Sequence, residues 1–292
     1  MTVREAYDLF MYEQRVRNNA ASTLEYYKTF LGEFIEWLDV DIVDNLTINE
    51  YRDYIIYLSA SGIKSTSINT KVRAVKAFYN FLIDNDQIGD CSRKLKLIKQ
   101  KREEIIILTD DEINSLLSCF DVTDTIELRN KCIVLLMLDC GLRRAETTRI
   151  LVKDIDFKQR TVLVNGKGDK QRIVPLGSST CEHLRKYSAR FADRKPGSPF
   201  FLDRFGNAID TNVIDCFFVK LKADTGIQRL RPHLLRHTFA TLYLIDGGNL
   251  EVLRIIMGHS SIAITQLYLH LAANYKLINS RYKSHIDQLG TP

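Results

Sequence analysis

The feature of the sequence that most constrains its fold is a helical spacing of apolar residues, clearest over residues 65–84. Apolar side chains recur there at intervals of three or four, whereas the buried face of a strand repeats at every second residue. The repeat consists of Ile68, Val72, Val75, Tyr79 and Leu82. This segment is therefore predicted to be an amphipathic helix that buries one face.

Capping boxes, in which Ser or Thr is followed three residues later by Glu, mark the start of further helices. The two side chains satisfy backbone N–H groups that the first helical turn leaves without partners. Such pairs are Ser22 with Glu25, Thr47 with Glu50, and Thr109 with Glu112. With an amphipathic stretch over residues 2–17, the pattern predicts a helical domain over residues 1–90.

Residues 91–107 are interpreted as a linker, because they lack a helical apolar stripe and carry a run of basic side chains. The run comprises Arg93, Lys94, Lys96, Lys99, Lys101 and Arg102. Up to Glu104 the chain has 15 basic against 16 acidic residues, and beyond it 26 against 20. A solvated connector and a basic strap that crosses a DNA backbone both fit this segment.

The segment 108–292 combines helices with a β-hairpin. A strongly apolar helix over residues 127–140 stops at Gly141, since glycine readily adopts the left-handed conformation that ends a helix. Two strand-like runs, TVLV and RIVPL, flank a turn that contains Asn165 and Gly166. The predicted fold is mostly α with a small β-sheet: a helical N-terminal domain, a linker and a larger α+β domain.

Composition argues against several classes of protein. The six cysteines show no C-x-x-C spacing, so no zinc site is predicted. No apolar run approaches the ~20 residues of a membrane helix, and the acidic start MTVREAYDLF is unlike a signal peptide. The formal net charge of +5 permits a polyanionic partner. The sequence thus predicts a cytoplasmic protein that is outside the membrane and has no metal.

Two segments place a basic side chain at a turn marked by glycine. Arg143 in GLRRAE has a planar guanidinium that suits a phosphate, but an ion pair with Glu146 explains it as well. Lys167 lies between two glycines in NGKGDK, where it either enters a groove or is an ordinary exposed lysine. Neither segment decides a function by itself.

Two further segments carry histidines. In RPHLLRH, His233 and Arg236 share the first turn of a predicted helix, whose free N–H groups favour an anion. His237 is placed on a different face and is interpreted as structural. In MGHSSIAITQLYLHLA, His259 lies in a turn and Tyr268 follows on the next helix. Because most tyrosines are packing residues, only the neighbouring segments distinguish Tyr268.

A polar face also follows the predicted helix over residues 65–84. It consists of Asn69, Arg73, Lys76 and Asn80. A solvated face is the simpler interpretation, because polar helix faces usually contact water. The alternative is a helix laid against DNA, with Arg and Lys on phosphates and Asn on base edges.

Taken together and in order, the four segments resemble the tyrosine recombinase (phage integrase-like) family, and the likeness extends over essentially the whole chain. The catalytic residues of the family fall on Arg143, Lys167, His233, Arg236, His259 and Tyr268. The resemblance makes residues 1–90 a core-DNA-binding domain, 91–107 a basic linker and 108–292 a catalytic domain. Its candidate DNA contacts are the polar face above with Lys99, Lys101 and Arg102.

The resemblance implies an enzyme that cleaves and rejoins duplex DNA at specific sites through a 3′-phosphotyrosyl intermediate. It assigns the attack to Tyr268, the phosphate clamp to Arg143 and Arg236, and proton transfer to His233 and Lys167. No metal or nucleotide is required, because the covalent link conserves the energy of the phosphodiester. The outcome would be integration, excision, inversion or resolution of DNA.

The same resemblance implies a third residue that binds the phosphate, and it implies how the protein assembles on DNA. His259 would hydrogen-bond the phosphate in the transition state. The protein would act as a homotetramer on two DNA sites, and as a monomer or weak oligomer without DNA. The C-terminal stretch fits an amphipathic helix that docks on a neighbour or packs on its own domain. Its apolar residues are Leu277, Ile278, Tyr282, Ile286 and Leu289.

Three other functions stay open: a type IB topoisomerase, a non-catalytic DNA-binding protein and a helical interaction module. Strand exchange between two sites, covalent attachment to DNA and salt-sensitive DNA binding would separate them. The layout is similar to that of the Xer recombinases, but the tail 274–292 does not show their terminal motif. This difference favours a mobile-element or DNA-inversion recombinase.

Overall fold

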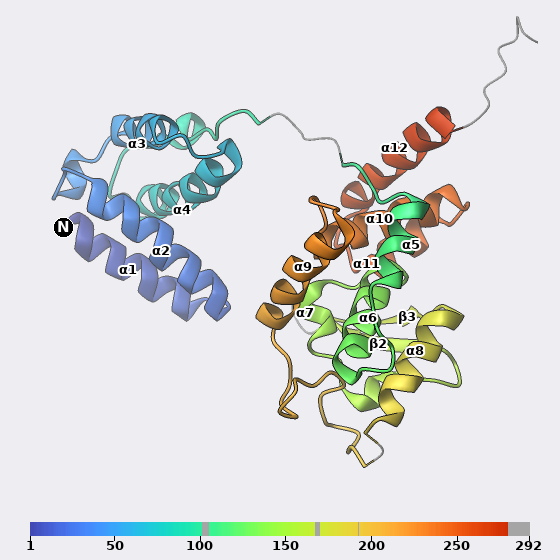
Figure 1. The fold of residues 1–292 in the computed structure, drawn as a ribbon. Helices are drawn as coiled ribbons and strands as arrows, with labels where there is room; N and C mark the ends of the chain where they lie inside the picture. The colour runs from blue at the N-terminus through green and yellow to red at the C-terminus, as the bar shows by residue number, and fades with distance from the viewer. Residues whose placement is uncertain (101–104, 167–169, 192, 280–292) are drawn as a thin grey trace, which may run out of the picture. The chain divides into compact units, whose positions relative to one another are not determined.

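The computed structural model describes residues 1–100, 105–166, 170–191 and 193–279, and the chain divides into two compact units near residue 103 (Figure 1). Helices dominate both units, and the second also contains a small antiparallel sheet. The predicted fold class is confirmed. Within the described ranges, every helix is too short or too polar to cross a membrane.

The first unit is a group of four α-helices with two short 3-10 turns. Aromatic rings from α2, α3 and α4 form much of its core, including Phe34, Tyr54 and Phe78. The helix predicted from apolar spacing is α4, and its bounds are those expected. The elements are α1 (Val3–Val16), α2 (Ala21–Trp37), η1 (Val43–Asn45), α3 (Ile48–Ala60), α4 (Ser65–Asp84) and η2 (Ser92–Lys94).

The capping boxes have mixed outcomes. Thr47 caps α3 and Thr109 caps α5 (Asp110–Ser118), each with the glutamate expected. The box at Ser22 is wrong. Helix α2 begins after Ala20, which provides no side-chain cap, so Ser22 lies within the first turn.

Part of the predicted linker packs against the first unit. Leu95 is 1% exposed and belongs to the core of that unit. The Lys76 ammonium donates to the Leu95 carbonyl at 2.8 Å. The Asn69 amide exchanges two hydrogen bonds with the backbone of Ile98, at 2.9 and 3.0 Å. Residues 95–98 are therefore held along α4 instead of forming a free connector.

The second unit is built around α6, a helix buried on nearly all sides that packs against α8 and α10. Its sheet has the order β1-β2-β3, with Val162 opposite Val174. The predicted hairpin is β2 and β3, whereas the two-residue β1 was not predicted. The remaining elements are α6 (Thr125–Leu138), α7 (Arg144–Thr147), η3 (Val152–Asp154), β1 (Ile155–Asp156), β2 (Thr161–Asn165), β3 (Gln171–Pro175), α8 (Ser178–Ala189), α9 (Thr211–Thr225), α10 (Pro232–Ile245), α11 (Leu250–Met257) and α12 (Ile262–Asn279).

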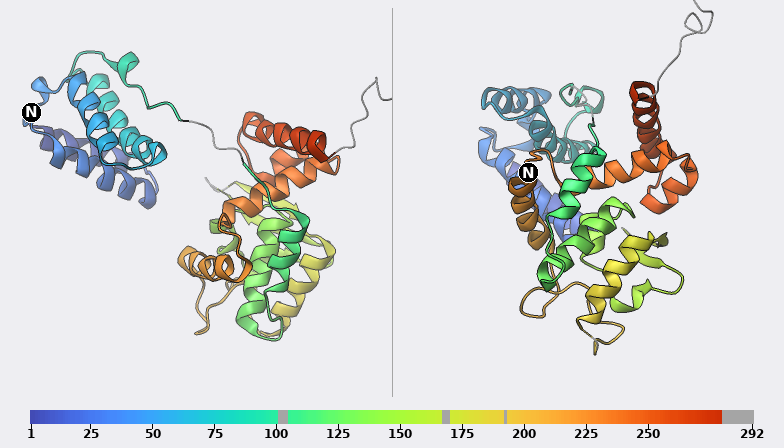
Figure 2. Two further views of the ribbon diagram at one scale, coloured as in Figure 1. Left: turned by 45° about the horizontal axis from the view of Figure 1, so that its top comes forward. Right: turned by 45° about the vertical axis from the view of Figure 1, so that its right-hand side comes forward.

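Helices α10, α11 and α12 contact one another at one end of the second unit, as both views in Figure 2 show. Pro232 occupies the first turn of α10, where its missing N–H has no intrahelical partner to lose. Gly258 ends α11 with a φ of 61°, and the Ser261 hydroxyl caps the start of α12. This end of the unit carries most of the predicted catalytic residues.

Candidate active site

The predicted catalytic residues converge from four elements of the second unit. Arg143 precedes α7, His233 and Arg236 lie on α10, His259 occupies the turn between α11 and α12, and Tyr268 lies on α12. The contacts below join Arg236, His259 and Tyr268 directly, bring Arg143 to the carbonyl of Gly258, and surround His233 with positive charge. Lys167 lies outside the described residues, as do the predicted C-terminal positions 280–292.

Three arginines from three elements donate to three consecutive carbonyls at the end of α11. Arg172 binds the carbonyl of Ile256 at 2.6 Å, Arg236 binds that of Met257, and Arg143 binds that of Gly258 at 3.3 Å. The last carbonyls of a helix lack intrahelical partners and carry the negative end of its dipole, so they stabilise cations. The end of α11 therefore sets the spacing of these guanidinium groups.

Gly258 is required at this position for two reasons. Its φ of 61° lies in the left-handed region, which other residues adopt at a cost. A Cβ atom there would lie 3.0 Å from the Arg172 guanidinium. A larger residue would therefore both strain the turn and push Arg172 away from α11.

Glu146 is the buried counter-charge of the site. It is 7% exposed and receives hydrogen bonds from the backbone and guanidinium of Arg143 and from both terminal nitrogens of Arg172. Burial raises its pKa, but the bonds from Arg172 and Arg143 outweigh that effect and leave the pKa below its usual value. The ion pair considered as the alternative for Arg143 is thus present, and 37% of that side chain stays exposed for a ligand.

Arg172 and the central position of Glu146 were not predicted. A signal for Arg172 does exist in the sequence, because it lies two residues before Val174 on β3. Residues at that spacing share a face of the strand, and Val174 is fully buried. An arginine on the inward face of a strand needs an acidic partner nearby.

Replacing Glu146 with glutamine is expected to lower the free energy of unfolding of the second unit by about 3–5 kcal/mol. The substitution leaves the guanidinium groups of Arg143 and Arg172 without their counter-charge. Urea unfolding would measure the change. The matched control is Glu182→Gln, which breaks an exposed ion pair with Lys186 and is expected to leave stability nearly unchanged. Equal small losses for the two variants would contradict the prediction.

Arg236 is the most deeply held cation of the site. It is 4% exposed, donates to the carbonyls of Gly141 and Met257, and contacts His259 Nε2 at 3.2 Å. Burial, followed by the charge of Arg143, lowers its pKa to about 9. The group therefore stays positive at neutral pH, and its orientation is fixed before any ligand arrives.

His259 is neutral at neutral pH, and its contacts define its tautomer. Burial, followed by the charge of Arg236, lowers its pKa to about 4. Guanidinium groups only donate, so Nε2 accepts from Arg236. Nδ1 then carries the proton and donates to the Thr265 hydroxyl at 2.9 Å. His259 is thus tied at both ring nitrogens.

Tyr268 lies against His259, and His237 binds its hydroxyl. The rings of Tyr268 and His259 stack at 6.2 Å with an interplanar angle of 10°. The Tyr268 hydroxyl lies 3.0 Å from His237 Nδ1, and Tyr268 is 4% exposed. Burial raises its pKa, and the charges of Arg236 and Arg143 partly offset this. The placement of His237 on a different face from His233 is wrong, because His237 lies one turn beyond His233 and contacts Tyr268 on α12.

His233 lies half-buried in a field of positive charge. Burial lowers its pKa, and the charges of Arg236, Arg144 and Arg231 lower it further. The imidazole is consequently neutral at neutral pH. A neutral histidine surrounded by arginines can accept a proton only when an anion offsets that charge, which makes the site suited to a phosphate.

The two deeply shifted histidines, His237 and His259, predict how stability depends on pH. Burial lowers the pKa of each to about 4 in the folded protein, whereas an unfolded histidine titrates near 6.5. Between these values the unfolded chain binds more protons, so stability rises with pH. We expect a loss of up to about 1.4 kcal/mol per pH unit for each histidine as the pH falls from 6.5 towards 4. Urea unfolding across this range would measure it, and an unchanged slope in His259→Gln would contradict it.

The candidate DNA contacts of the first unit lie in different settings. Asn69 is 2% exposed and committed to the backbone of Ile98, so we withdraw it as a base contact. Lys76 is half-buried against the Leu95 carbonyl. Arg73 and Lys99 are exposed and Asn80 is half-buried. Lys101 and Arg102 lie outside the described residues.

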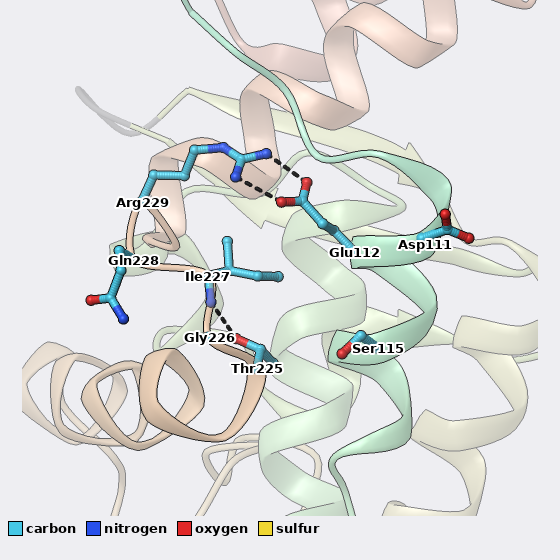
Figure 3. Close-up of a pocket in the computed structure, with 8 residues that line it drawn as sticks. All are labelled: Asp111, Glu112, Ser115, Thr225, Gly226, Ile227, Gln228 and Arg229. Atoms are coloured by element: carbon cyan, nitrogen blue, oxygen red, sulfur yellow. Dashed lines mark hydrogen bonds and ion pairs between the residues drawn. The ribbon is translucent and has the colours of Figure 1, made fainter.

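One cavity of the second unit contains none of the predicted catalytic residues. It measures about 530 Å³ and lies between the start of α5 and the segment after α9. Figure 3 shows Arg229 and Glu112 facing each other across it, joined by hydrogen bonds of 2.7 and 2.5 Å. Within the same ranges, no three His, Cys, Asp or Glu side chains gather as metal ligands would. In this cavity the arginine is already paired with a carboxylate. The arginine-rich site is the better candidate, because several of its positive groups converge and are not all paired with carboxylates.

Comparison with known proteins gives matches over nearly the whole chain. The model described as phage integrase family matches residues 107–275, and the one described as phage integrase, N-terminal SAM-like domain, matches residues 8–86. The tyrosine recombinase XerC of Bacillus pumilus (strain SAFR-032) is 32% identical over 286 residues, which span 94% of this chain and 93% of the relative.

Solved structures are similar as well. The crystal structure of XerA recombinase shows 26% sequence identity and a TM-score of 0.53, with 96% of this chain and 99% of that chain covered. The structure of the Tn1549 transposon integrase in complex with transposon right end DNA has a TM-score of 0.76. It covers 97% of this chain and 100% of that chain at 20% identity, which shows a common fold.

Proposed function

The chain belongs to the phage integrase family and is a site-specific tyrosine recombinase that breaks and rejoins DNA, and from this premise we propose that Tyr268 is its nucleophile. The observation that carries the proposal is the position of Tyr268. Its ring stacks on His259, and its pKa responds to the charges of Arg236 and Arg143. Among residue types, tyrosine supplies a hydroxyl that can form a covalent phosphodiester.

In the proposed reaction, the Tyr268 oxygen attacks phosphorus in line and forms a 3′-phosphotyrosyl bond as the bond to the 5′-oxygen breaks. Arg143 and Arg236 balance the charge that develops on the non-bridging oxygens. His233 takes the phenol proton, because a bound phosphate offsets the arginine charges that depress its pKa. Lys167 gives a proton to the departing 5′-oxygen.

His259 has a more specific requirement in this scheme. Its Nε2 accepts from Arg236, so donation to a phosphate oxygen needs a change of tautomer or a second proton. The negative charge of the phosphate favours that protonation. Rejoining is the reverse reaction, and the phosphotyrosyl bond conserves the energy of the phosphodiester. The proposal therefore includes no metal or nucleotide cofactor.

We propose duplex DNA with specific recombination sites as the partner, bound by both units, with two sites brought together in a homotetramer. The integrase structure cited above contains transposon-end DNA. Arg73 and Lys99 are the exposed candidate contacts in the first unit. We place the reaction in the cytoplasm. Its outcome is the integration, excision, inversion or resolution of DNA.

A suicide-substrate experiment tests the proposed function. Purified protein is mixed, without metal, with a nicked duplex that carries its site, so that the cleaved end diffuses away and the covalent complex accumulates. We expect a slow-migrating complex that survives denaturation, with the DNA on Tyr268 in peptide mass spectrometry. Binding without any covalent complex would favour a non-catalytic DNA-binding protein instead.

A second experiment separates recombination from the relaxation of supercoils. Two labelled duplexes with the same site are incubated with the protein, and joined products are resolved on a gel. Exchange of flanking sequences is expected. Relaxation of a supercoiled plasmid without exchange would identify a topoisomerase.

A further inference from the structure

The Tyr268 hydroxyl has a defined partner, and it is not the histidine to which the proton transfer is assigned. Within the described residues, its hydrogen bond goes to His237 Nδ1 at 3.0 Å. His237 lies on α10 and Tyr268 on α12, and their rings are 5.6 Å apart. The bond therefore joins the helix that carries the nucleophile to the helix that carries Arg236.

Two adjacent residues of α10 hold the two stacked rings of the site. Arg236 binds Nε2 of His259, and His237 binds the hydroxyl of Tyr268. The two rings so held face each other almost in parallel. The Arg236–His237 pair thus fixes the position of Tyr268 relative to His259, the residue proposed to bind the phosphate.

Apolar packing alone cannot supply this orientation. The Tyr268 ring lies in a small cluster with Leu244, Leu253 and Met257, among others. The phenol oxygen moves with the ring, but apolar contacts are non-directional and leave the O–H bond free to rotate. A hydrogen bond prefers a nearly linear geometry and fixes the direction of that O–H bond.

We propose that His237 is a positioning residue that holds the Tyr268 hydroxyl in its reactive place beside His259 and Arg236. The inference rests on the proposed role of Tyr268 as the nucleophile. In it the hydroxyl donates to Nδ1 until attack, so that the lone pairs of the phenol oxygen stay available for phosphorus; the O–H bond then turns and its proton passes to His233. Burial, followed by His233, lowers the pKa of His237 to about 4, so the ring is neutral and can accept at neutral pH.

Single-turnover cleavage of the suicide substrate tests this role in three variants. His237→Ala is expected to cleave about 100-fold more slowly, the size of effect that small misplacements of reacting groups produce. His237→Asn is expected to recover most of the rate, because its side-chain oxygen can accept a hydrogen bond near the place of Nδ1. His183→Ala, which removes an exposed histidine bonded to its own helix, is the matched control and is expected to cleave normally. DNA affinity is expected to be unchanged in all three.

Two outcomes would overturn the inference. His237→Ala cleaving at the wild-type rate would show that the bond does not matter, and His237→Asn as slow as His237→Ala would show that a hydrogen-bond acceptor is not sufficient. If His237→Ala binds DNA poorly, its melting temperature is compared with that of the wild type. A lower melting temperature would assign the loss to unfolding, and an unchanged one would count against a role confined to positioning. A double-mutant cycle with Tyr268→Phe, measured as the free energy of unfolding in urea because Tyr268→Phe cannot cleave, is expected to be non-additive, and additivity would reject the bond.

Failure of the proposed function has a separate signature. If the wild-type protein forms no adduct on Tyr268, the nucleophile assignment itself is rejected, whatever the His237 variants do. If the wild type forms that adduct and His237→Ala is equally fast, only the positioning role is rejected.

Discussion

Replacing Tyr268 with phenylalanine is expected to eliminate covalent attachment to DNA while binding to DNA persists. The substitution removes one oxygen and keeps the ring in its apolar cluster against His259. Without that oxygen no phosphotyrosyl bond can form, so the rate of cleavage should fall by at least about 10⁴-fold. Denaturing gels of the suicide-substrate reaction would measure the adduct, and a mobility-shift titration would measure binding.

A second tyrosine provides the control for this substitution. Tyr187 is also buried, at 1% exposure, and its hydroxyl accepts a hydrogen bond from the Leu202 backbone. Tyr187→Phe therefore also removes one buried hydroxyl and its hydrogen bond, but outside the site. The variant should still form the adduct. An adduct that persists in Tyr268→Phe would mean that another side chain attacks the phosphate.

Replacing Arg236 with lysine is expected to slow cleavage by about 10²–10³-fold, although the charge is retained. The guanidinium contacts the Gly141 and Met257 carbonyls and His259 together. A lysine ammonium is a compact point charge and cannot reproduce this planar set of contacts. His259 would lose the partner that fixes it against Tyr268. Single-turnover cleavage at saturating protein would isolate this effect from DNA binding.

The control for the arginine is Arg160→Lys. Arg160 donates to the Ser178 hydroxyl at an exposed position of the same unit, so its substitution should leave cleavage unchanged. Arg236→Ala is less informative, because it also leaves two buried carbonyls unpaired and so lowers stability. Cleavage by Arg236→Lys at the wild-type rate would show that charge alone suffices.

Much of the local structure could be predicted from sequence because its causes are local. The apolar spacing in α4 and the capping boxes of α3 and α5 act within a few residues. The β-hairpin follows equally from two short runs around Asn165–Gly166. The start of α2 was missed because Ser22 has a capping sequence but lies inside a turn that is already helical.

Contacts across the fold were harder to predict, because helical spacing tells which residues share a face but not what lies opposite. The polar residues of α4 do share one face, yet that face is not simply solvated, because its Asn69 binds the backbone of Ile98. His237 was dismissed for the same reason, since nothing local places Tyr268 against it. The pairing of Glu146 with Arg172 joins residues from α7 and β3 that are 26 positions apart.

The three carbonyls at the end of α11 also limit which changes of length the chain can tolerate. Each belongs to the next residue in sequence, and each is matched to an arginine from a different element. Inserting or deleting one residue between Ile256 and Gly258 would change which carbonyl meets Arg236 or Arg143, whereas the exposed stretch at 204–207 anchors no such set. Chimaeras that exchange segments between relatives should therefore keep their junctions outside this turn.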